Sequence, residues 1–176
     1  MAAARRPPHP RHRLLLTTVY AAGLRVSEAV ALEVTDIDSA RMTIRVREGK
    51  GGRDRYVMLS PQLLAILRAH WRRTRARPWL FPGPDPSRPI TTRTVRRVCR
   101  LAVEAAGLDK SVTVHTLRHC FATHLLEQGV DIRVIQGLLG HRQIASTTRY
   151  ARVALSTIGQ VQSPLELLDL GGPPPA

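Results

Sequence analysis

The chain has 176 residues, enough for one domain with a sizeable hydrophobic core. Its 27 lysines and arginines against 13 acidic residues give a net charge of +14, which indicates a polyanionic partner, nucleic acid before an anionic membrane surface. Aromatic residues are only 4% of the chain, which disfavours a single-strand binder that stacks bases on aromatic side chains.

The N-terminal part is predicted to hold two helices after a short arm. Residues 1–10 suit a disordered basic arm. Residues 11–22 suit a helix, and Gly23 is well placed to end it in the left-handed conformation. A second helix is predicted over residues 24–33, which places Arg25 in the tight corner between the two helices.

A β-hairpin is predicted next. Residues 42–47 alternate between apolar and polar side chains, as in a half-buried strand, and residues 55–59 suit a second strand. The glycine-rich turn between them, residues 48–54, carries Lys50 and Arg53, and Arg53 is expected to contact DNA. Taken alone, Lys50 suits a solvated loop charge.

The middle of the chain is predicted to be helical around one proline-rich loop. Pro61 opens a helix whose apolar face is predicted to be core, with Leu63, Leu64, Leu67 and Trp71 on it. Residues 78–89 suit either an inter-domain linker or a loop that packs back on the domain through its segment Trp79-Leu80-Phe81.

A basic helix is predicted from Thr91 or Thr92 to Gly107. One side of it is apolar, and the other carries Arg93, Arg96, Arg97 and Arg100. A run of charge on a helix is usually a solvated face, but four arginines without an acidic partner indicate contacts with DNA phosphates. Such contacts would give affinity and register rather than sequence reading.

The last third is predicted to hold short helices over residues 115–129 and 131–140, followed by one that residues 146–148 cap and that carries Tyr150. Residues 163–170 suit a weak helix. Its cluster of leucines could pack on its own domain or dock on a neighbouring molecule.

Four side chains of this last third, His115, Arg118, His141 and Tyr150, could act on one anionic group. Arginine offers a planar fork that matches phosphate oxygens, and histidine donates or accepts a proton near neutral pH. Tyrosine is an oxygen nucleophile. The set suits chemistry on a phosphate better than chemistry on a carbonyl.

Two rival chemistries fit less well. His115, His119 and His124 with Cys120 could be taken for a metal site, but Thr116 stands where a metalloprotease of the His-Glu-x-x-His type needs glutamate, and the paired cysteines of a zinc finger are missing. A Ser-His-Asp hydrolase lacks its Gly-x-Ser-x-Gly elbow.

Five segments in this order and spacing resemble the tyrosine recombinase (phage integrase) family: Gly23-Leu-Arg25-Val-Ser-Glu28, Gly49-Lys50-Gly, His115-Thr-Leu-Arg118-His119, Leu139-Gly-His141 and Thr147-Thr-Arg-Tyr150. Each segment alone is weak, but together they cover roughly residues 11–153. The resemblance implies a catalytic domain that is mainly α-helical with a small antiparallel β-sheet (α+β), in agreement with the predicted elements.

The resemblance also implies a role for each matching residue. Tyr150 would attack the scissile phosphate and form a 3′-phosphotyrosyl bond, while Lys50 protonates the departing 5′-oxygen. Arg25 and Arg118 would stabilise the charged transition state. His115 would assist proton transfer, and His141 would hydrogen-bond the phosphate. Neither a metal nor another cofactor is implied, because the arginines and the lysine supply the positive charge.

The resemblance implies a catalytic domain over residues 11–160 and leaves residues 161–176 as a tail or docking segment. Family members usually carry a smaller DNA-binding domain before the Gly-Leu-Arg segment, and about two dozen residues before Arg25 are too few for one. The chain is therefore expected to be a catalytic domain without the N-terminal core-binding domain. Arg152 stands where relatives often have histidine.

The expected function is a site-specific DNA recombinase or integrase. The expected partners are double-stranded DNA and either further copies of the chain, four in this family's strand exchange, or a full-length recombinase. Alternatives are a catalytically silent DNA-binding remnant and a type IB topoisomerase. Two cysteines in apolar helical patterns, no membrane-length apolar run and no signal peptide favour a cytoplasmic location.

Overall fold

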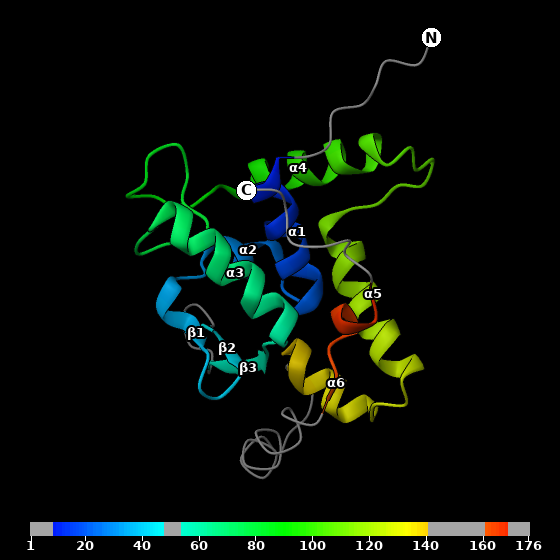
Figure 1. Cartoon of the computed structure of the whole chain (residues 1–176). Coiled ribbons are helices and arrows are strands. Elements are labelled where there is room, and N and C mark those ends of the chain that lie inside the picture. Colours follow the sequence, from blue (N-terminus) through cyan, green and yellow to red (C-terminus); the bar gives the residue numbers. More distant parts are fainter. Residues whose placement is uncertain (1–8, 48–53, 141–160, 169–176) are drawn as a thin grey trace.

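The computed structural model describes residues 9–47, 54–140 and 161–168 (Figure 1). Its helices are α1 (Pro10–Ala21), α2 (Val26–Val30), α3 (Pro61–Thr74), α4 (Thr92–Ala105), α5 (Val114–Glu127) and α6 (Ile132–Leu139), with short 3-10 helices η1 (Val34–Asp36) and η2 (Pro164–Leu167). Its strands are β1 (Ile37–Asp38), β2 (Thr43–Val46) and β3 (Arg55–Met58). The predicted fold class, mainly α with a small antiparallel sheet, is confirmed. Lys50, Arg53, His141 and the predicted helix with Tyr150 lie outside the described residues.

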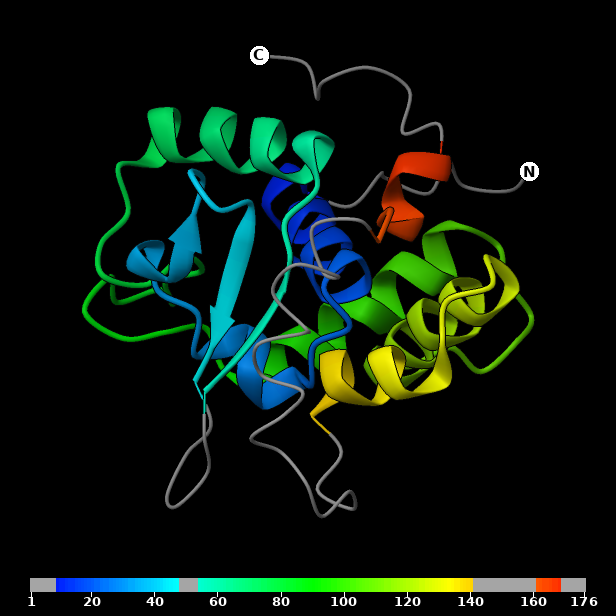
Figure 2. The same cartoon turned by 90° about the horizontal axis from the view of Figure 1, so that it is seen from below.

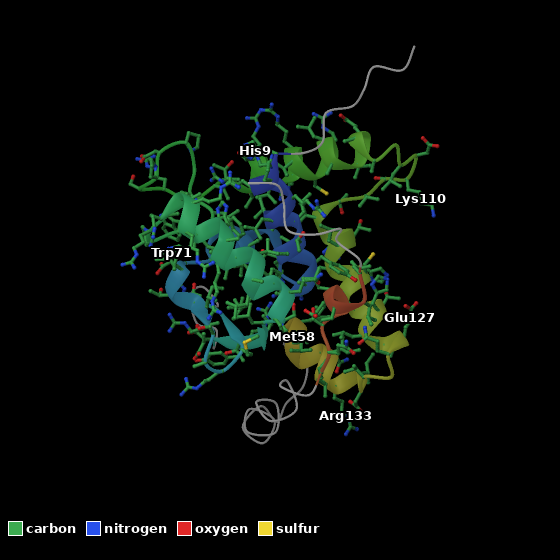
Figure 3. All side chains as sticks on the ribbon, in the orientation of Figure 1. His9, Met58, Trp71, Lys110, Glu127 and Arg133 are labelled. Atoms are coloured by element: carbon green, nitrogen blue, oxygen red, sulfur yellow. The ribbon has the colours of Figure 1, made fainter. Side chains whose placement is uncertain are left out.

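Helix α1 lies at the centre of the fold, between α3 and α5 (Figures 1 and 2). The chain enters it through Pro10, and His9 caps its start by accepting a hydrogen bond from the backbone N–H of Arg11. Figure 3 shows His9 at the end of α1 that lies beside α4. The buried residues of α1 are Leu14, Leu15, Thr18, Val19, Tyr20 and Ala21, and all but Thr18 belong to the main core cluster. The hydroxyl of Thr18 donates to the Leu14 carbonyl oxygen, which satisfies this buried polar group within the helix.

The sheet is antiparallel in the order β1-β2-β3, with Ile44 opposite Val57 in the central pair. Ile44, Val46 and Val57 are buried, so the alternating pattern places the β2–β3 hairpin against the core. Met58 ends β3 at the junction with α6 (Figure 3). Figure 2 shows the C-terminal end of β2, the N-terminal end of β3, α2 and the C-terminal end of α6 along one side of the molecule.

The second predicted helix is much shorter than residues 24–33. Helix α2 ends at Val30 because the next residues pair with a different part of the chain: Leu32 accepts a backbone hydrogen bond from Leu80, and the backbone N–H of Val34 donates to Pro78. Glu33 forms an isolated β-bridge with Trp79. The same contacts show that the proline-rich loop packs back on the domain, with Leu80 and Phe81 buried.

The prediction that Trp71 is core is corrected in part, and one of the two predicted alternatives for the C-terminal leucines is observed. Trp71 is only partly buried, and the guanidinium carbons of Arg75 and Arg77 lie 4.7 and 5.8 Å from its ring centroid. The C-terminal segment packs on its own domain: Leu165 is buried, and Glu166 accepts the backbone N–H of Gln62 at the start of α3. Leu167 and Leu168 stay exposed. No helix in the described ranges is long and apolar enough to cross a membrane.

The turn between α1 and α2 depends on Gly23, and we predict an unequal effect of alanine at two glycines. Gly23 has φ +58°, and a Cβ there would lie 2.5 Å from Cδ1 of the Phe121 ring, whereas a Cβ at Gly129 (φ +78°) would meet nothing within 4 Å. Gly23→Ala should lower the free energy of unfolding by about 3 kcal/mol, from backbone strain plus overpacking, and Gly129→Ala by only about 1 kcal/mol. Urea unfolding of both variants measures the difference, and equal losses would contradict this packing.

Candidate active site

The site begins at the turn between α1 and α2. Gly23 approaches the Phe121 ring of α5 so closely that no side chain fits there. Arg25 follows in an extended conformation and caps α2. Its backbone N–H donates to Oε2 of Glu28 (2.7 Å), and its Nη1 donates to Oε1 of the same carboxylate (2.8 Å). The Arg25 side chain is 42% exposed, so this guanidinium faces solvent.

Helix α5 carries Arg118, the second arginine predicted for the site. Thr113 caps the helix start by accepting the backbone N–H of Thr116, and His115 lies exposed in the first turn. Arg118, one turn further, is only 4% exposed. Its Nη1 donates to the Gly23 carbonyl oxygen (2.7 Å) and its Nη2 to that of Leu139. The guanidinium therefore joins the α1–α2 turn to the end of α6.

One carboxylate, that of Glu28, lies among three guanidinium groups. Arg55 of β3 donates from Nη1 to Oε1 and from Nη2 to Oε2, both at 2.8 Å. Arg118 Nη1 lies 3.7 Å from Oε2. Burial raises the pKa of Glu28, but the hydrogen bonds and charge of Arg55 and the hydrogen bonds from Arg25 more than offset it and leave this pKa at about 2. Glu28 is therefore ionised throughout the neutral range.

The carbonyl oxygens at the C-terminus of α6 accept hydrogen bonds from the same three arginines. Arg55 Nε donates to the Leu138 carbonyl oxygen (2.8 Å), Arg118 to Leu139, and Arg25 Nη2 to Gly140 (3.3 Å). The last carbonyls of a helix lack partners within the helix and carry its partial negative charge, so cations stabilise them. Gly140 adopts φ +64°, and the chain leaves α6 there toward His141.

The charges of this site do not cancel. Three guanidinium groups face one carboxylate, and burial together with the neighbouring Arg25 and Arg55 lowers the pKa of Arg118 to about 10, although Glu28 opposes this. Arg118 is still protonated at neutral pH, but its charge is incompletely compensated. An anion beside Arg25 and Arg118 would relieve that repulsion, and a guanidinium pair of this kind can hold the oxygens of a phosphate.

The structure thus brings Arg25, Arg118 and Glu28 together and leaves His115 exposed in the first turn of the helix that carries Arg118. The predicted Lys50, His141 and Tyr150 lie outside the described residues, as does Arg53. Within the described ranges, no group of three or more His, Cys, Asp or Glu side chains is placed to hold a metal ion.

Four of the five predicted DNA-contacting arginines form one exposed stripe on α4, at positions 93, 96, 97 and 100, and the fifth, Arg53, lies outside the described residues. The expectation that they have no acidic partner is wrong for Arg100, whose Nη1 lies 2.7 Å from Oε1 of Glu104, one turn further along the helix.

Two members of the site are not identifiable from the sequence pattern alone. Glu28 belongs to the Gly-Leu-Arg segment but has no predicted role, and Arg55 looks like an ordinary strand residue. The one signal in the sequence is the position of Arg55 in a buried strand, where an arginine needs partners. Its partners lie 27 and 83 residues away along the chain, which no local pattern reveals.

Comparisons with known proteins show which family the chain resembles over most of its length. Residues 1–156 match the model of the phage integrase family. A Sinorhizobium fredii protein named as an integrase/recombinase (y4qK) is 54% identical over 165 residues, which cover 94% of this chain and 54% of that protein. The chain thus spans about half the length of that relative.

Two solved structures have a similar fold. The integrase from mycobacterium phage Brujita is 29% identical with a TM-score of 0.72, over 96% of this chain and 55% of that one. The XerH site-specific recombinase bound to its difH substrate is 28% identical with a TM-score of 0.66, over 88% of this chain and 44% of that one.

The low pKa of Glu28 predicts a specific pH dependence of stability. A carboxyl whose pKa falls from 4.5 to about 2 on folding stabilises the native state fully above pH 4.5, and this contribution is lost as the pH falls toward 2. A shift of this size corresponds to roughly 3 kcal/mol. The difference in unfolding free energy between the wild type and Glu28→Gln should therefore shrink across that interval in urea titrations.

The matched control is Glu104→Gln, which removes an exposed carboxylate that also pairs with an arginine. Exposed pairs contribute little to stability, so this variant should follow the wild type at every pH. A Glu28→Gln difference that does not change between neutral and acid pH would contradict the proposed ion cluster.

Proposed function

The chain belongs to the phage integrase family, and from this membership we propose that it is the catalytic part of a site-specific DNA recombinase. Such an enzyme cleaves and rejoins DNA strands through a 3′-phosphotyrosyl intermediate. The observation that carries the proposal is the convergence of Arg25 and Arg118 on one carboxylate, where the Arg25 guanidinium faces solvent and three cations surround one anion. The two arginines are separated by about half of the chain, and both fall in family motifs.

The proposed reaction needs no cofactor. The Tyr150 oxygen attacks the scissile phosphorus, the bond from phosphorus to the 5′-oxygen breaks, and a 3′-phosphotyrosyl bond forms. The tyrosine proton passes toward His115, and Lys50 protonates the departing 5′-oxygen. His141 hydrogen-bonds the phosphate. Attack by a 5′-hydroxyl then reverses these steps and rejoins the strands without ATP, because the phosphodiester energy is kept in the protein–DNA bond.

Arg25 and Arg118 supply the electrostatic part of this chemistry. Negative charge spreads over the non-bridging phosphate oxygens in the transition state, and guanidinium groups already in place stabilise it without reorganisation. The hydrogen bonds of Arg118 to Gly23 and Leu139 hold its guanidinium in a fixed position. The roles of Lys50, His141 and Tyr150 rest on the family motifs.

Double-stranded DNA is the proposed partner, since the solved relative XerH is bound to its difH substrate. The net charge of +14 and the exposed arginine stripe of α4 support binding through phosphates. Assembly of several copies on DNA, or with a full-length recombinase, is part of the proposal. Leu167 and Leu168 are exposed apolar residues that could contact a neighbouring copy.

The nucleophile is tested by trapping. The purified protein is mixed with nicked duplexes from the DNA that flanks its own gene and then denatured. The wild type should leave a denaturation-resistant adduct, and Tyr150→Phe should leave none. Tyr56→Phe is the matched control, because Tyr56 is an exposed tyrosine of β3 outside the proposed site, and it should form the adduct. Salt-sensitive binding without any wild-type adduct would favour a DNA-binding remnant instead.

The α4 stripe is tested by the salt dependence of duplex binding. The triple variant Arg93→Ala/Arg96→Ala/Arg97→Ala leaves out Arg100, which pairs with Glu104. Its plot of log binding constant against log salt should flatten by about 0.9 for each phosphate that the variant no longer neutralises. The variant Arg68→Ala/Arg72→Ala/Arg73→Ala removes the same charge from the exposed side of α3 and should keep the wild-type slope. Equal slopes for the two triple variants would show that only net charge matters.

A further inference from the structure

Arg55 is a buried cation without a predicted part in the reaction. Its side chain is 9% exposed, and its Nε, Nη1 and Nη2 all donate hydrogen bonds of 2.8 Å. Two of these reach the carboxylate of Glu28 in α2 as a parallel fork, and the third reaches the Leu138 carbonyl oxygen in α6. Arg55 therefore ties the β-hairpin to the two elements on which Arg25 and the exit toward His141 depend.

The end of α6 is built closely around this side chain. A Cβ at Gly140 would lie 3.0 Å from Cδ of Arg55 and 3.2 Å from its Nε. Gly140 therefore permits the approach in two ways, through its missing side chain and through its φ of +64°. The guanidinium and the chain that leaves α6 are fixed against each other.

Arg55 also limits how Arg25 binds Glu28. The carboxylate accepts four hydrogen bonds: Oε1 from Nη1 of both Arg25 and Arg55, and Oε2 from the backbone N–H of Arg25 and from Nη2 of Arg55. Four bonds fill the acceptor positions of a carboxylate. The side chain of Arg25 thus binds Glu28 through Nη1 only, and its Nη2 donates instead to the Gly140 carbonyl oxygen. Without Arg55, two acceptor positions of Glu28 would be free, and both Nη atoms of Arg25 could donate to this carboxylate. The N–H groups of Arg25 would then turn away from the solvent.

We propose that Arg55 is a positioning residue of the recombinase site. It occupies two acceptor positions of the Glu28 carboxylate and donates to the Leu138 carbonyl oxygen. These contacts keep the guanidinium groups of Arg25 and Arg118 directed at the scissile phosphate. The inference rests on the proposed function of the same site. Arg55 is not expected to touch the DNA, because its side chain is 9% exposed and each of its three nitrogens already donates to Glu28 or Leu138.

The test compares Arg55→Ala and Arg55→Lys with the wild type in single-turnover cleavage of the nicked duplex. A misplacement of about 1 Å can cost on the order of 100-fold in rate, so Arg55→Ala should cleave about that much more slowly. Its duplex affinity should stay within about threefold of the wild type, because phosphate contacts elsewhere supply most of the binding. Arg55→Lys keeps the charge but not the fork, and it should remain several-fold slower than the wild type.

Two readouts separate positioning from loss of fold. Added guanidinium chloride, at concentrations far below those that unfold proteins and against equal sodium chloride, should partly restore the cleavage rate of Arg55→Ala and leave the wild type unchanged. Loss of the hydrogen bonds and charge of Arg55 should also raise the pKa of Glu28 from about 2, although Arg25 and Arg118 still face it. Carbon-13 NMR of the carboxyl group measures this pKa without any cleavage.

The matched control is Arg45→Ala on the neighbouring strand β2. Arg45 pairs with buried Asp36 at 3.2 Å, and Asp36 keeps Arg47 when Arg45 is removed. This variant should cleave at the wild-type rate. Wild-type cleavage by Arg55→Ala would overturn the inference and leave the proposed function standing. A slow Arg55→Ala that guanidinium does not rescue and whose Glu28 pKa is unchanged would also overturn it. A wild type without any adduct would overturn the proposed function itself.

Discussion

The candidate site depends on one buried carboxylate. Glu28 lies in the first turn of α2 and accepts hydrogen bonds from Arg25 and Arg55, while Arg118 lies 3.7 Å away. A buried ion is stable only when it is paired and hydrogen-bonded, and here the pairing comes from elements that are far apart in the sequence. The same carboxylate therefore fixes α2, β3 and α5 relative to one another. Removing it would leave three like charges facing one another.

The excess of positive charge is what turns this structural cluster into a site. A cluster with equal positive and negative charge would not attract an anion. Here three guanidinium groups surround one carboxylate, which leaves net positive charge beside the solvent-facing Arg25. The carbonyl oxygens at the C-terminus of α6 compensate part of this positive charge, because they accept hydrogen bonds from all three arginines. A phosphate can supply the rest. Binding of the anion and stability of the fold thus draw on the same side chains, and the arginines are in position before DNA arrives.

The sequence indicates the chemistry of this site better than its construction. The helices, the hairpin and the convergence of Arg25 with Arg118 follow from periodicity, from glycine at helix ends and from the family motifs. The early end of α2 does not, because it is decided by backbone pairing with the loop around Pro78 and Leu80. Arg55 is hidden for a similar reason: its partners, Glu28 and the Leu138 carbonyl, become neighbours only in the folded chain. The ion pair of Arg100 with Glu104 is the opposite case, since the spacing of four residues makes it visible in the sequence.

The most direct measurement is a crystal structure of Tyr150→Phe with a duplex that contains the scissile phosphate. The account predicts that this phosphate lies between the guanidinium groups of Arg25 and Arg118, while Arg55 keeps both hydrogen bonds to Glu28 and the one to the Leu138 carbonyl. It is contradicted if the phosphate binds elsewhere, or if Arg55 leaves Glu28 to contact the DNA. In that case Arg55 would be a catalytic residue and Glu28 a partner that it exchanges for substrate.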